Sequence, residues 1–383
     1  MPGFSFVLRL MAVLAAAHVY VGLRLIPDLA LTDSQHVFAV AALVLSCILM
    51  PMALLVRPFS ARAWSDWVAG IGLVVMGLFS SVFVLTLLRD AVLAAVLTVS
   101  TLFSITLSLP ALKADSALAV LVLALGATLL GAFNARRLAR VVRVDVPIAG
   151  LPPALHGFTI VQISDIHVGP TIKRGYVEHI VKAVNALKPD LIAITGDVVD
   201  GPVARLATHT QPLGQLTARH GAFLVTGNHE YYSGVDHWVA EFRRIGLSVL
   251  MNEHVLLHHD DTPLVVAGVT DYSAGVFNPA QTSNPAAALD GAPANAISLL
   301  LAHQPRSAAA AAPAGYKLQL SGHTHGGQFL PWNLFVRLQQ PFTAGLHRFE
   351  DMWVYTSRGT GYWGPPNRLG APSEITLLTL VAG

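Results

Sequence analysis

The sequence predicts a membrane-anchored α/β protein, in which an amino-terminal bundle of transmembrane helices precedes an α/β domain. The first observation is composition, because 54% of the 383 residues are hydrophobic and 12% are charged, whereas soluble proteins carry about 25% charged residues. The second is distribution, because only 11 charged residues precede Asn134. The third is a series of short β-rich runs after residue 150, with helix-like stretches between the early ones. The two regions therefore suit two different solvents.

Four apolar segments are long enough to cross a hydrocarbon core of about 30 Å as helices. They are residues 4–23, 37–56, 67–88 and 117–133. A fifth segment, residues 91–109, is apolar but rich in serine and threonine, and only Arg89 and Asp90 separate it from the preceding span. It either crosses the membrane or lies on its surface, so we expect four or five spans within residues 1–135. A cleavable signal peptide would explain only the first.

The bundle is interpreted chiefly as an anchor, because its predicted spans contain no Asp, Glu or Lys of the kind that marks an ion pathway. Its orientation follows from the basic residues at the span ends. The densest group directly follows the last span and comprises Arg136, Arg137, Arg140 and Arg143. With four spans, that side also holds Arg9, Arg57 and Arg62, seven basic residues against three, and with five spans the count is six against four. We therefore expect a multi-pass protein of the cell (inner) membrane with its α/β domain in the cytoplasm.

Charge and cysteine content exclude two classes of function. The net charge is +2, and no basic stripe outside the arginine group could neutralise a run of phosphates, so nucleic acid is not an expected partner. The single cysteine, Cys47, excludes an intrachain disulfide and a CxxC redox or zinc site. Nothing in the pattern indicates an oligomeric state.

Residues 136–153 are expected to form a juxtamembrane linker, because residues 144–153 contain three prolines and a glycine and favour an extended connector. The following domain, residues 154–383, has the βαβ order of an α/β domain. Its strands are predicted at residues 158–163, 191–194, 222–225, 264–269, 297–301, 318–320, 353–356 and 375–380. Its helices are predicted at residues 174–187 and 236–245, with the alanine-rich residues 308–314 as a helix or turn.

Residue types that bind metals follow several of these strands, where open α/β sheets place their sites. In chain order they are Asp165, His167, Asp197, Asn228, His229, Glu230, His303, His323 and His325. Ligand types stand two residues apart in cases such as Asp165 and His167, so an extended backbone would point both side chains the same way. Gly196, Gly227 and Gly322 allow close approach of the backbone beside them. The sequence therefore predicts one site assembled from five loops.

The ordered blocks DxH, GD, GNHE, a single downstream histidine and GHTH resemble the signature of calcineurin-like metallophosphoesterases over residues 151–380. Single blocks have low specificity, but the ordered set is specific. The resemblance implies two mixed β-sheets flanked by helices, an αββα arrangement, and hydrolysis of phosphoester or pyrophosphate bonds. It assigns one divalent metal to Asp165, His167 and His325, the other to Asn228, His303 and His323, and a bridging position to Asp197.

The same resemblance implies a mechanism in which a metal-bridging hydroxide attacks phosphorus. Asp197 and His229 are the implied catalytic residues, with His229 contacting a phosphate oxygen or protonating the leaving group and Glu230 orienting it. The mixed histidine, carboxylate and amide set suits two divalent ions of Mn, Fe or Zn.

The substrate is suggested by two later segments, the apolar residues 331–342 and the GYWGPP run at residues 361–366. They are either ordinary core or, beside a bilayer, an interfacial wedge or acyl-chain groove. The SGHTHGGQ form also resembles the bacterial membrane-associated branch, which includes UDP-diacylglucosamine hydrolases. We therefore expect a membrane lipid or lipid precursor as substrate.

Two alternatives remain. In the first alternative, the chain is a membrane transporter or receptor with a regulatory phosphoesterase-like domain. In the second, the domain is a non-catalytic binding module. The second alternative normally involves loss of ligands, whereas none of the seven is missing here. The remaining histidines match no motif and are expected on the surface or in loops: His156, His179, His209, His220, His237, His254, His258, His259 and His347.

Overall fold

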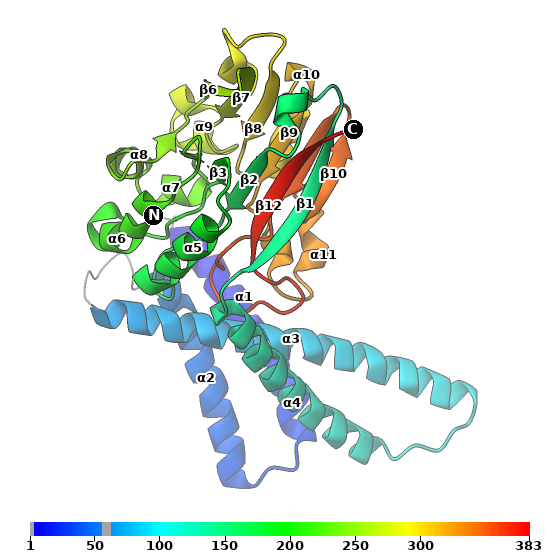
Figure 1. Cartoon of the computed structure of the whole chain (residues 1–383). Helices are drawn as coiled ribbons and strands as arrows, with labels where there is room; N and C mark the ends of the chain where they lie inside the picture. The colour runs from blue at the N-terminus through cyan, green and yellow to red at the C-terminus, as the bar shows by residue number, and fades with distance from the viewer. Residues whose placement is uncertain (1–3, 56–62) are drawn as a thin grey trace. The chain divides into compact units, whose positions relative to one another are not determined.

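The computed structural model describes residues 4–55 and 63–383, and the chain divides into two compact units (Figure 1). The helical unit comprises Met1–Phe133 and Gly364–Asn367, and the sheet unit comprises Asn134–Trp363 and Arg368–Gly383. Two basic residues used in predicting the orientation, Arg57 and Arg62, lie outside the described residues.

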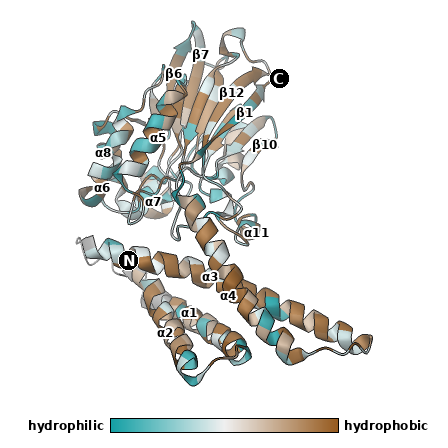
Figure 2. Cartoon of the chain, turned by 60° about the horizontal axis from the view of Figure 1, so that its bottom comes forward, coloured by the Kyte–Doolittle hydropathy of each residue, from teal (hydrophilic) through white to brown (hydrophobic). Residues whose placement is uncertain are grey.

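Four long helices make up most of the helical unit. They are α1 (Phe4–Leu25), α2 (Asp33–Leu55), α3 (Ala63–Leu102) and α4 (Leu109–Arg136). Each is long and apolar enough to cross a membrane. Large apolar side chains remain exposed along all four, and hydrophobic residues dominate them in Figure 2. Helices that are apolar on every side are adapted to lipid, so the prediction of an apolar helical bundle is confirmed.

The expected break between the third and fifth apolar segments is wrong. Helix α3 runs without interruption through Arg89 and Asp90 to Leu102, and it contains 40 residues. At 1.5 Å per residue such a helix is about 60 Å long, roughly twice the thickness of the hydrocarbon core. Residues 91–102 are therefore a continuation of α3, and the described residues contain four candidate spans.

A group of polar and charged residues surrounds the buried Arg89 in the helical unit, and we name it the interhelical charge cluster: Tyr20, Arg24, Asp28, Arg89 and Asp90. Arg89 is 5% exposed, pairs with Asp28 and donates to the Arg24 carbonyl at 2.9 Å. Asp90 accepts from Arg24 Nε at 2.7 Å and from the Tyr20 hydroxyl at 2.5 Å. Asp90 lies between two of the predicted apolar segments, and the sequence analysis did not expect it within a continuous helix. Asp90 is tolerated because charged partners compensate it.

The sheet unit contains two six-stranded sheets, ordered β1-β12-β2-β3-β4-β5 and β10-β11-β9-β8-β7-β6. The strands are β1 (Arg140–Ile148), β2 (Thr159–Ile163), β3 (Leu191–Ile194), β4 (Ala222–Leu224), β5 (Ser248–Val249), β6 (Glu253–His259), β7 (Thr262–Gly268), β8 (Ile297–Leu301), β9 (Leu318–Ser321), β10 (Gly345–Phe349), β11 (Met352–Thr356) and β12 (Glu374–Ala382). Both sheets are mixed, because β12 runs antiparallel to β2, and β6 and β10 run antiparallel to their neighbours. All eight predicted strands are present.

The two sheets pack face to face, with helices outside them. Alternate residues of the strands, such as Ile160 and Leu299, fill the core between the sheets. The outer face of the first sheet is covered by α5 (Arg174–Ala186), α6 (Val203–Thr210) and α8 (Val235–Arg244), and that of the second by α10 (Ala308–Ala314). The remaining helices are short: α7 (Asn228–Ser233), α9 (Ala274–Phe277) and α11 (Asn333–Val336). The predicted αββα arrangement is confirmed.

Part of the predicted linker is a strand. Residues Arg140–Ile148 form β1 and pair in parallel with the whole of β12. The prolines and the glycine of residues 144–153 suggested a connector, but β1 lies at the edge of its sheet, where polar side chains face solvent and a proline is tolerated.

The ordinary-core interpretation of residues 331–342 is also wrong. Around the short helix α11, Trp332 is 43%, Leu334 67% and Leu338 84% exposed. Leu330 and Phe335 are about half exposed as well. We name residues 330–338 the apolar segment.

Candidate metal centre

The predicted ligand residues lie in loops that follow β2, β3, β4, β8 and β9. Asp165 and His167 follow β2, Asp197 follows β3, and His303 follows β8. These strands are neighbours within their sheets, so their carboxyl ends meet at one end of the sandwich. The structure brings the predicted residues together in overlapping groups.

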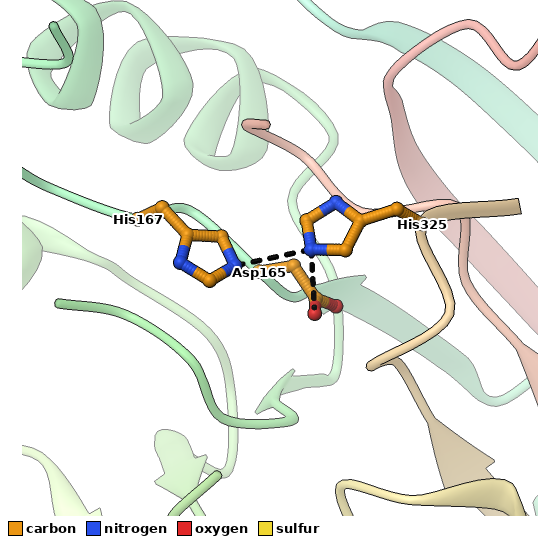
Figure 3. A group of neighbouring side chains, drawn as sticks. All are labelled: Asp165, His167 and His325. Atoms are coloured by element: carbon orange, nitrogen blue, oxygen red, sulfur yellow. Dashed lines mark hydrogen bonds and ion pairs between the residues drawn. The ribbon is translucent and has the colours of Figure 1, made fainter. Parts of the chain in front are cut away.

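The first group consists of Asp165, His167 and His325, whose side chains converge in Figure 3. His167 Nε2 lies 3.0 Å from His325 Nε2, which lies 3.4 Å from Asp165 Oδ1. All three side chains are buried. Three potential ligand atoms that face one another in this way have the arrangement of a metal-binding site.

The second group consists of Asp197, His303 and His323. His303 Nε2 lies 3.2 Å from Asp197 Oδ2 and 3.2 Å from His323 Nδ1. Asp197 Oδ2 is also 3.8 Å from His167 Nε2 in the first group, so this carboxylate lies between the two. Asn228 Oδ1 is buried and has no hydrogen-bond partner, as expected of an acceptor that awaits a ligand.

The hydrogen bonds and protonation states of the histidines suit metal binding. His303 Nδ1 donates to the Thr195 carbonyl at 2.7 Å, and His167 Nδ1 donates to Asp200 at 2.9 Å. In the neutral rings, Nε2 then carries a lone pair that faces the site. Burial lowers the pKa of His323 to about 3. Burial, with the charge of Arg368, lowers the pKa of His325 well below its usual range. Neutral histidines are the form that binds metal.

His229 belongs to a third group, with His167 and Asp197. Its Nδ1 lies 2.6 Å from Asp200 Oδ1, its Nε2 lies 4.0 Å from Asp197 Oδ2, and its side chain is 15% exposed. Burial opposes a charge on the ring, but the carboxylates of Asp197 and Asp200 outweigh it and raise the pKa of His229 to about 9. Because part of the His229 side chain is exposed, the ring lies at the open side of the site.

Asp200 is a site residue that the sequence analysis missed. Its carboxylate accepts from both His167 and His229, and the two histidines hold its pKa well below the usual range despite burial. Its only signal is its position three residues after Asp197.

Glu230 has a different role from the one predicted. Its carboxylate accepts from the backbone N–H groups of Gly227, Asp197, Val198 and Val199 at 2.7 to 3.2 Å. It therefore fixes the loops after β3 and β4 to each other, and Asp200, not Glu230, orients His229.

Arg368 is a second residue that the sequence analysis missed, because it lies far beyond the last motif. It is 1% exposed, and its Nη1 donates to the His325 carbonyl at 2.9 Å. Its Nη2 lies 3.0 Å from His325 Nδ1. The guanidinium of Arg368 therefore fixes the position of the predicted ligand His325 through its backbone carbonyl and Nδ1.

The backbone at the site is strained. Asp165, His167, Asp197, His323 and His325 all have φ between 52° and 69°, a left-handed conformation that costs non-glycine residues about 1–2 kcal/mol. The expected extended backbone is therefore wrong, although the side chains do converge. The predicted close approach is confirmed at Gly227, where a Cβ atom would collide with Asp197 Oδ1.

Exposed aromatic residues surround His229. The rings of Tyr232 and Trp363 lie 5.2 and 5.9 Å from it, and Phe277 contacts Tyr232. Tyr232 is 63%, Trp363 51% and Phe277 49% exposed. We name these three residues the aromatic rim.

Among the histidines that match no motif, His259 is not at the surface. It is 7% exposed on β6, and its Nδ1 lies 3.0 Å from His220 Nε2. The pair packs against Phe158 and not among the predicted ligands.

The family of the chain follows from its sequence similarity to known proteins. The calcineurin-like phosphoesterase family matches residues 158–327. A Bos taurus transmembrane protein with metallophosphoesterase domain is 41% identical over 266 residues, 67% of this chain and 60% of that protein. An uncharacterized metallophosphoesterase of Aquifex aeolicus is 32% identical over 258 residues, 66% of this chain and 97% of that protein. A solved 5′-nucleotidase precursor from Thermus thermophilus aligns with a TM-score of 0.38 and 16% identity, over 58% of this chain and 54% of that one.

The chain thus spans about 60% of the length of the bovine relative but nearly all of the Aquifex protein. Its five motif loops meet at one end of an αββα sandwich, as the resemblance implied. On these grounds it belongs to the calcineurin-like metallophosphoesterase family, as a membrane protein with four apolar helices among its described residues.

Proposed function

We propose that the sheet unit hydrolyses phosphoester or pyrophosphate bonds with two divalent metal ions of Mn, Fe or Zn. Asp165, His167 and His325 would hold one ion, and Asn228, His303 and His323 the other. Asp197 would bridge them, since its carboxylate lies between the two groups. Two such ions polarise a phosphoryl oxygen and lower the pKa of an attacking water.

The observation that carries this proposal is the convergence of acceptors at the site. The Nε2 atoms of His167 and His303 are directed inward because their Nδ1 atoms donate to oxygens. A carboxylate oxygen of Asp197 lies 3.2 Å from the second of these atoms. Buried acceptors that face one another at such distances are stabilised by a shared cation.

The residues of the chain divide the remaining work. His229, held at Nδ1 by Asp200, has a partly exposed side chain with Nε2 4.0 Å from Asp197 Oδ2, where it would bind a phosphate oxygen or protonate the leaving group. Arg368 positions His325, and Glu230 holds the two loops that carry Asp197 and Asn228.

A membrane lipid or lipid precursor is the substrate class that we propose. Two features support it: the chain carries four apolar helices, and the aromatic rim leaves large apolar surface beside His229. Rings in this position suit an acyl chain or another apolar group attached to the phosphoester.

We also propose that the sheet unit faces the cytoplasm from the cell (inner) membrane. The support is the arginine group at Arg136, Arg137, Arg140 and Arg143, because basic residues beside a span stay on the cytoplasmic side. Protease treatment of membrane vesicles of known sidedness tests this. Cleavage of the sheet unit only in inverted vesicles is expected, and cleavage in right-side-out vesicles would contradict it.

The central test uses the purified full chain, with bis-p-nitrophenyl phosphate and p-nitrophenyl phosphate compared across Mn²⁺, Zn²⁺ and Mg²⁺. Chelator-sensitive turnover and two bound metals per chain are expected. The variant Asp197→Asn should lose turnover, whereas the control Asp351→Asn, at a fully exposed side chain, should keep it. Folded protein that binds no metal, or an active Asp197→Asn variant, would contradict the dinuclear proposal.

A further inference from the structure

We propose that the sheet unit docks on an anionic bilayer surface, using the apolar segment and an adjacent arginine-lined cavity. The apolar segment enters the acyl region, and the cavity binds the phosphate of a lipid headgroup. This inference goes beyond the proposed reaction, because docking does not require turnover.

The apolar segment is poorly suited to water. Five large apolar side chains within nine residues are between 43% and 84% exposed: Leu330, Trp332, Leu334, Phe335 and Leu338. The short helix α11 presents several of them together. Contiguous exposed apolar patches of this kind mark membrane or protein contacts, and a cluster of Trp, Phe and Leu is typical of interfacial insertion.

The arginine-lined cavity has a volume of about 210 Å³. Three of its lining residues are Arg137, Arg140 and Arg368, and none is acidic. Arg368 is 1% exposed; its Nη atoms donate to backbone carbonyls and His325, and its Nε has no partner. A buried guanidinium without a carboxylate partner is costly, and guanidinium groups match phosphate geometry well. The cavity is therefore suited to a phosphate group.

The two features adjoin. The Leu330 N–H donates to the Leu369 carbonyl at 3.2 Å, and Phe329 forms a bridge with Gly370, which lines the cavity. Figure 1 places α11 and the start of β1 at the same end of the two sheets. An apolar surface beside a phosphate-binding cavity matches the two parts of a phospholipid.

The chain itself brings this surface to a membrane. Asn134, near the end of α4, donates to the Arg368 carbonyl at 3.3 Å. Ala135 and Ala139 are buried in the core of the sheet unit, so the residues that directly follow the last apolar stretch belong to the sheet unit and line its cavity from Asn134 onward. Since α4 is a candidate span, the nearest abundant phosphate is a lipid headgroup, and anionic lipids attract arginine residues at such positions.

Docking would also act close to the metal centre. Leu330 lies five residues after His325, and Arg368 contacts both the cavity and His325. A docked sheet unit therefore holds its candidate site at the lipid surface.

Spin labelling of the full chain in nanodiscs tests docking without an activity assay. In a Cys47→Ser background, a nitroxide is attached to Leu338→Cys or to the control Leu256→Cys, an exposed leucine on edge strand β6. In nanodiscs that contain phosphatidylglycerol, the label at 338 should be accessible to oxygen and protected from a water-soluble nickel chelate. The label at 256 should remain in water. A label at 338 that remains in water, or one broadened by a second label nearby, would overturn bilayer docking, the latter by indicating a second copy.

The headgroup part has its own comparison. Replacing phosphatidylglycerol with phosphatidylcholine should weaken protection at 338, and Arg140→Gln should have the same effect, by roughly fivefold in the docking equilibrium. Arg143→Gln removes a charge from the same strand but not from the cavity and should have a smaller effect. Equal effects of the two variants would overturn the cavity as the headgroup site.

Discussion

Two clusters of polar residues, one in each unit, differ in how their charges are compensated. In the interhelical charge cluster every charge has an opposite partner: Asp90 accepts from Arg24 and Tyr20, and Arg89 pairs with Asp28. In the candidate metal centre, ring nitrogens and carboxylates converge without an opposite charge for each carboxylate, as where His303 Nε2 lies 3.2 Å from both His323 Nδ1 and Asp197 Oδ2. The first arrangement is complete without a ligand, and the second is not.

The difference shows how a structural polar cluster can be told from a functional one. Burial alone does not separate them, since Arg89 and Asp165 are both buried. What separates them is whether donors and acceptors balance within the protein. The comparison leads to four predictions, ordered from the largest expected effect to the smallest.

The largest effect is expected at His229. His229→Ala should lower kcat about 10²–10⁴-fold, as is usual for loss of a general acid, because the partly exposed ring lies beside Asp197. Bound metal, measured by elemental analysis, should stay unchanged. His237→Ala, at an exposed position on α8, is the control. Loss of metal in His229→Ala would instead make His229 a ligand, as its place in the third group allows.

A substitution in the interhelical charge cluster should lower the free energy of unfolding and leave turnover unchanged. Arg89→Ala leaves Asp28 without its partner and should destabilise the chain by about 3–5 kcal/mol, the usual result of breaking a buried pair. Chemical unfolding in detergent measures this, with Lys113→Ala, at an exposed side chain, as the control. Turnover per folded molecule should not change. A folded Arg89→Ala variant with no turnover would make the helical unit more than an anchor.

Asp200→Asn should lower metal affinity or activity about 10–100-fold, the usual effect of losing a group that orients a metal-binding histidine. In the native chain the Asp200 carboxylate accepts from His167 and His229. The neutral amide oxygen of asparagine would accept these hydrogen bonds less strongly. Metal titration of the purified variant measures the loss, and Asp290→Asn at the surface provides the baseline. Unchanged affinity and unchanged kcat would remove Asp200 from the site.

The smallest effect is expected at the aromatic rim. Trp363→Ala should raise KM for a long-chain lipid phosphoester roughly fivefold, in line with truncation of an aromatic contact. KM for p-nitrophenyl esters should not change. Val276→Ala, at a side chain 85% exposed, is the control. An equal rise in KM for both substrates would indicate that Trp363 shapes the site and does not bind an acyl chain.

The sequence was sufficient for most of the fold, because buried strands such as β3 and β8 are short continuous apolar runs. Edge strands were missed for the opposite reason. Strand β1 contains three charged residues and Pro147, and β6 contains Glu253 and three histidines, so neither is a continuous apolar run. Helix α3 was split at Arg89 and Asp90 because their partners on α1 are remote in sequence.

The candidate site was predictable only as far as its motifs extend. The ligand types stand in ordered blocks, but Asp200 and Arg368 lie outside them and act through other residues. Glu230 was assigned to its sequence neighbour His229, whereas it accepts from backbone groups of another loop. Contacts between loops are set by tertiary packing, which spacing along the chain does not encode.

The left-handed backbone at five predicted ligand positions links metal to folding. Only the assembled sandwich imposes these conformations, so an unfolded chain has no comparable site, and ion binding adds directly to native stability. At a free ion concentration of a hundred times Kd, the gain is about 2.7 kcal/mol for each independent site. Chelation would therefore lower the melting temperature of the sheet unit. In a cell compartment without the metal ion, the protein would lose stability as well as activity and would be degraded faster.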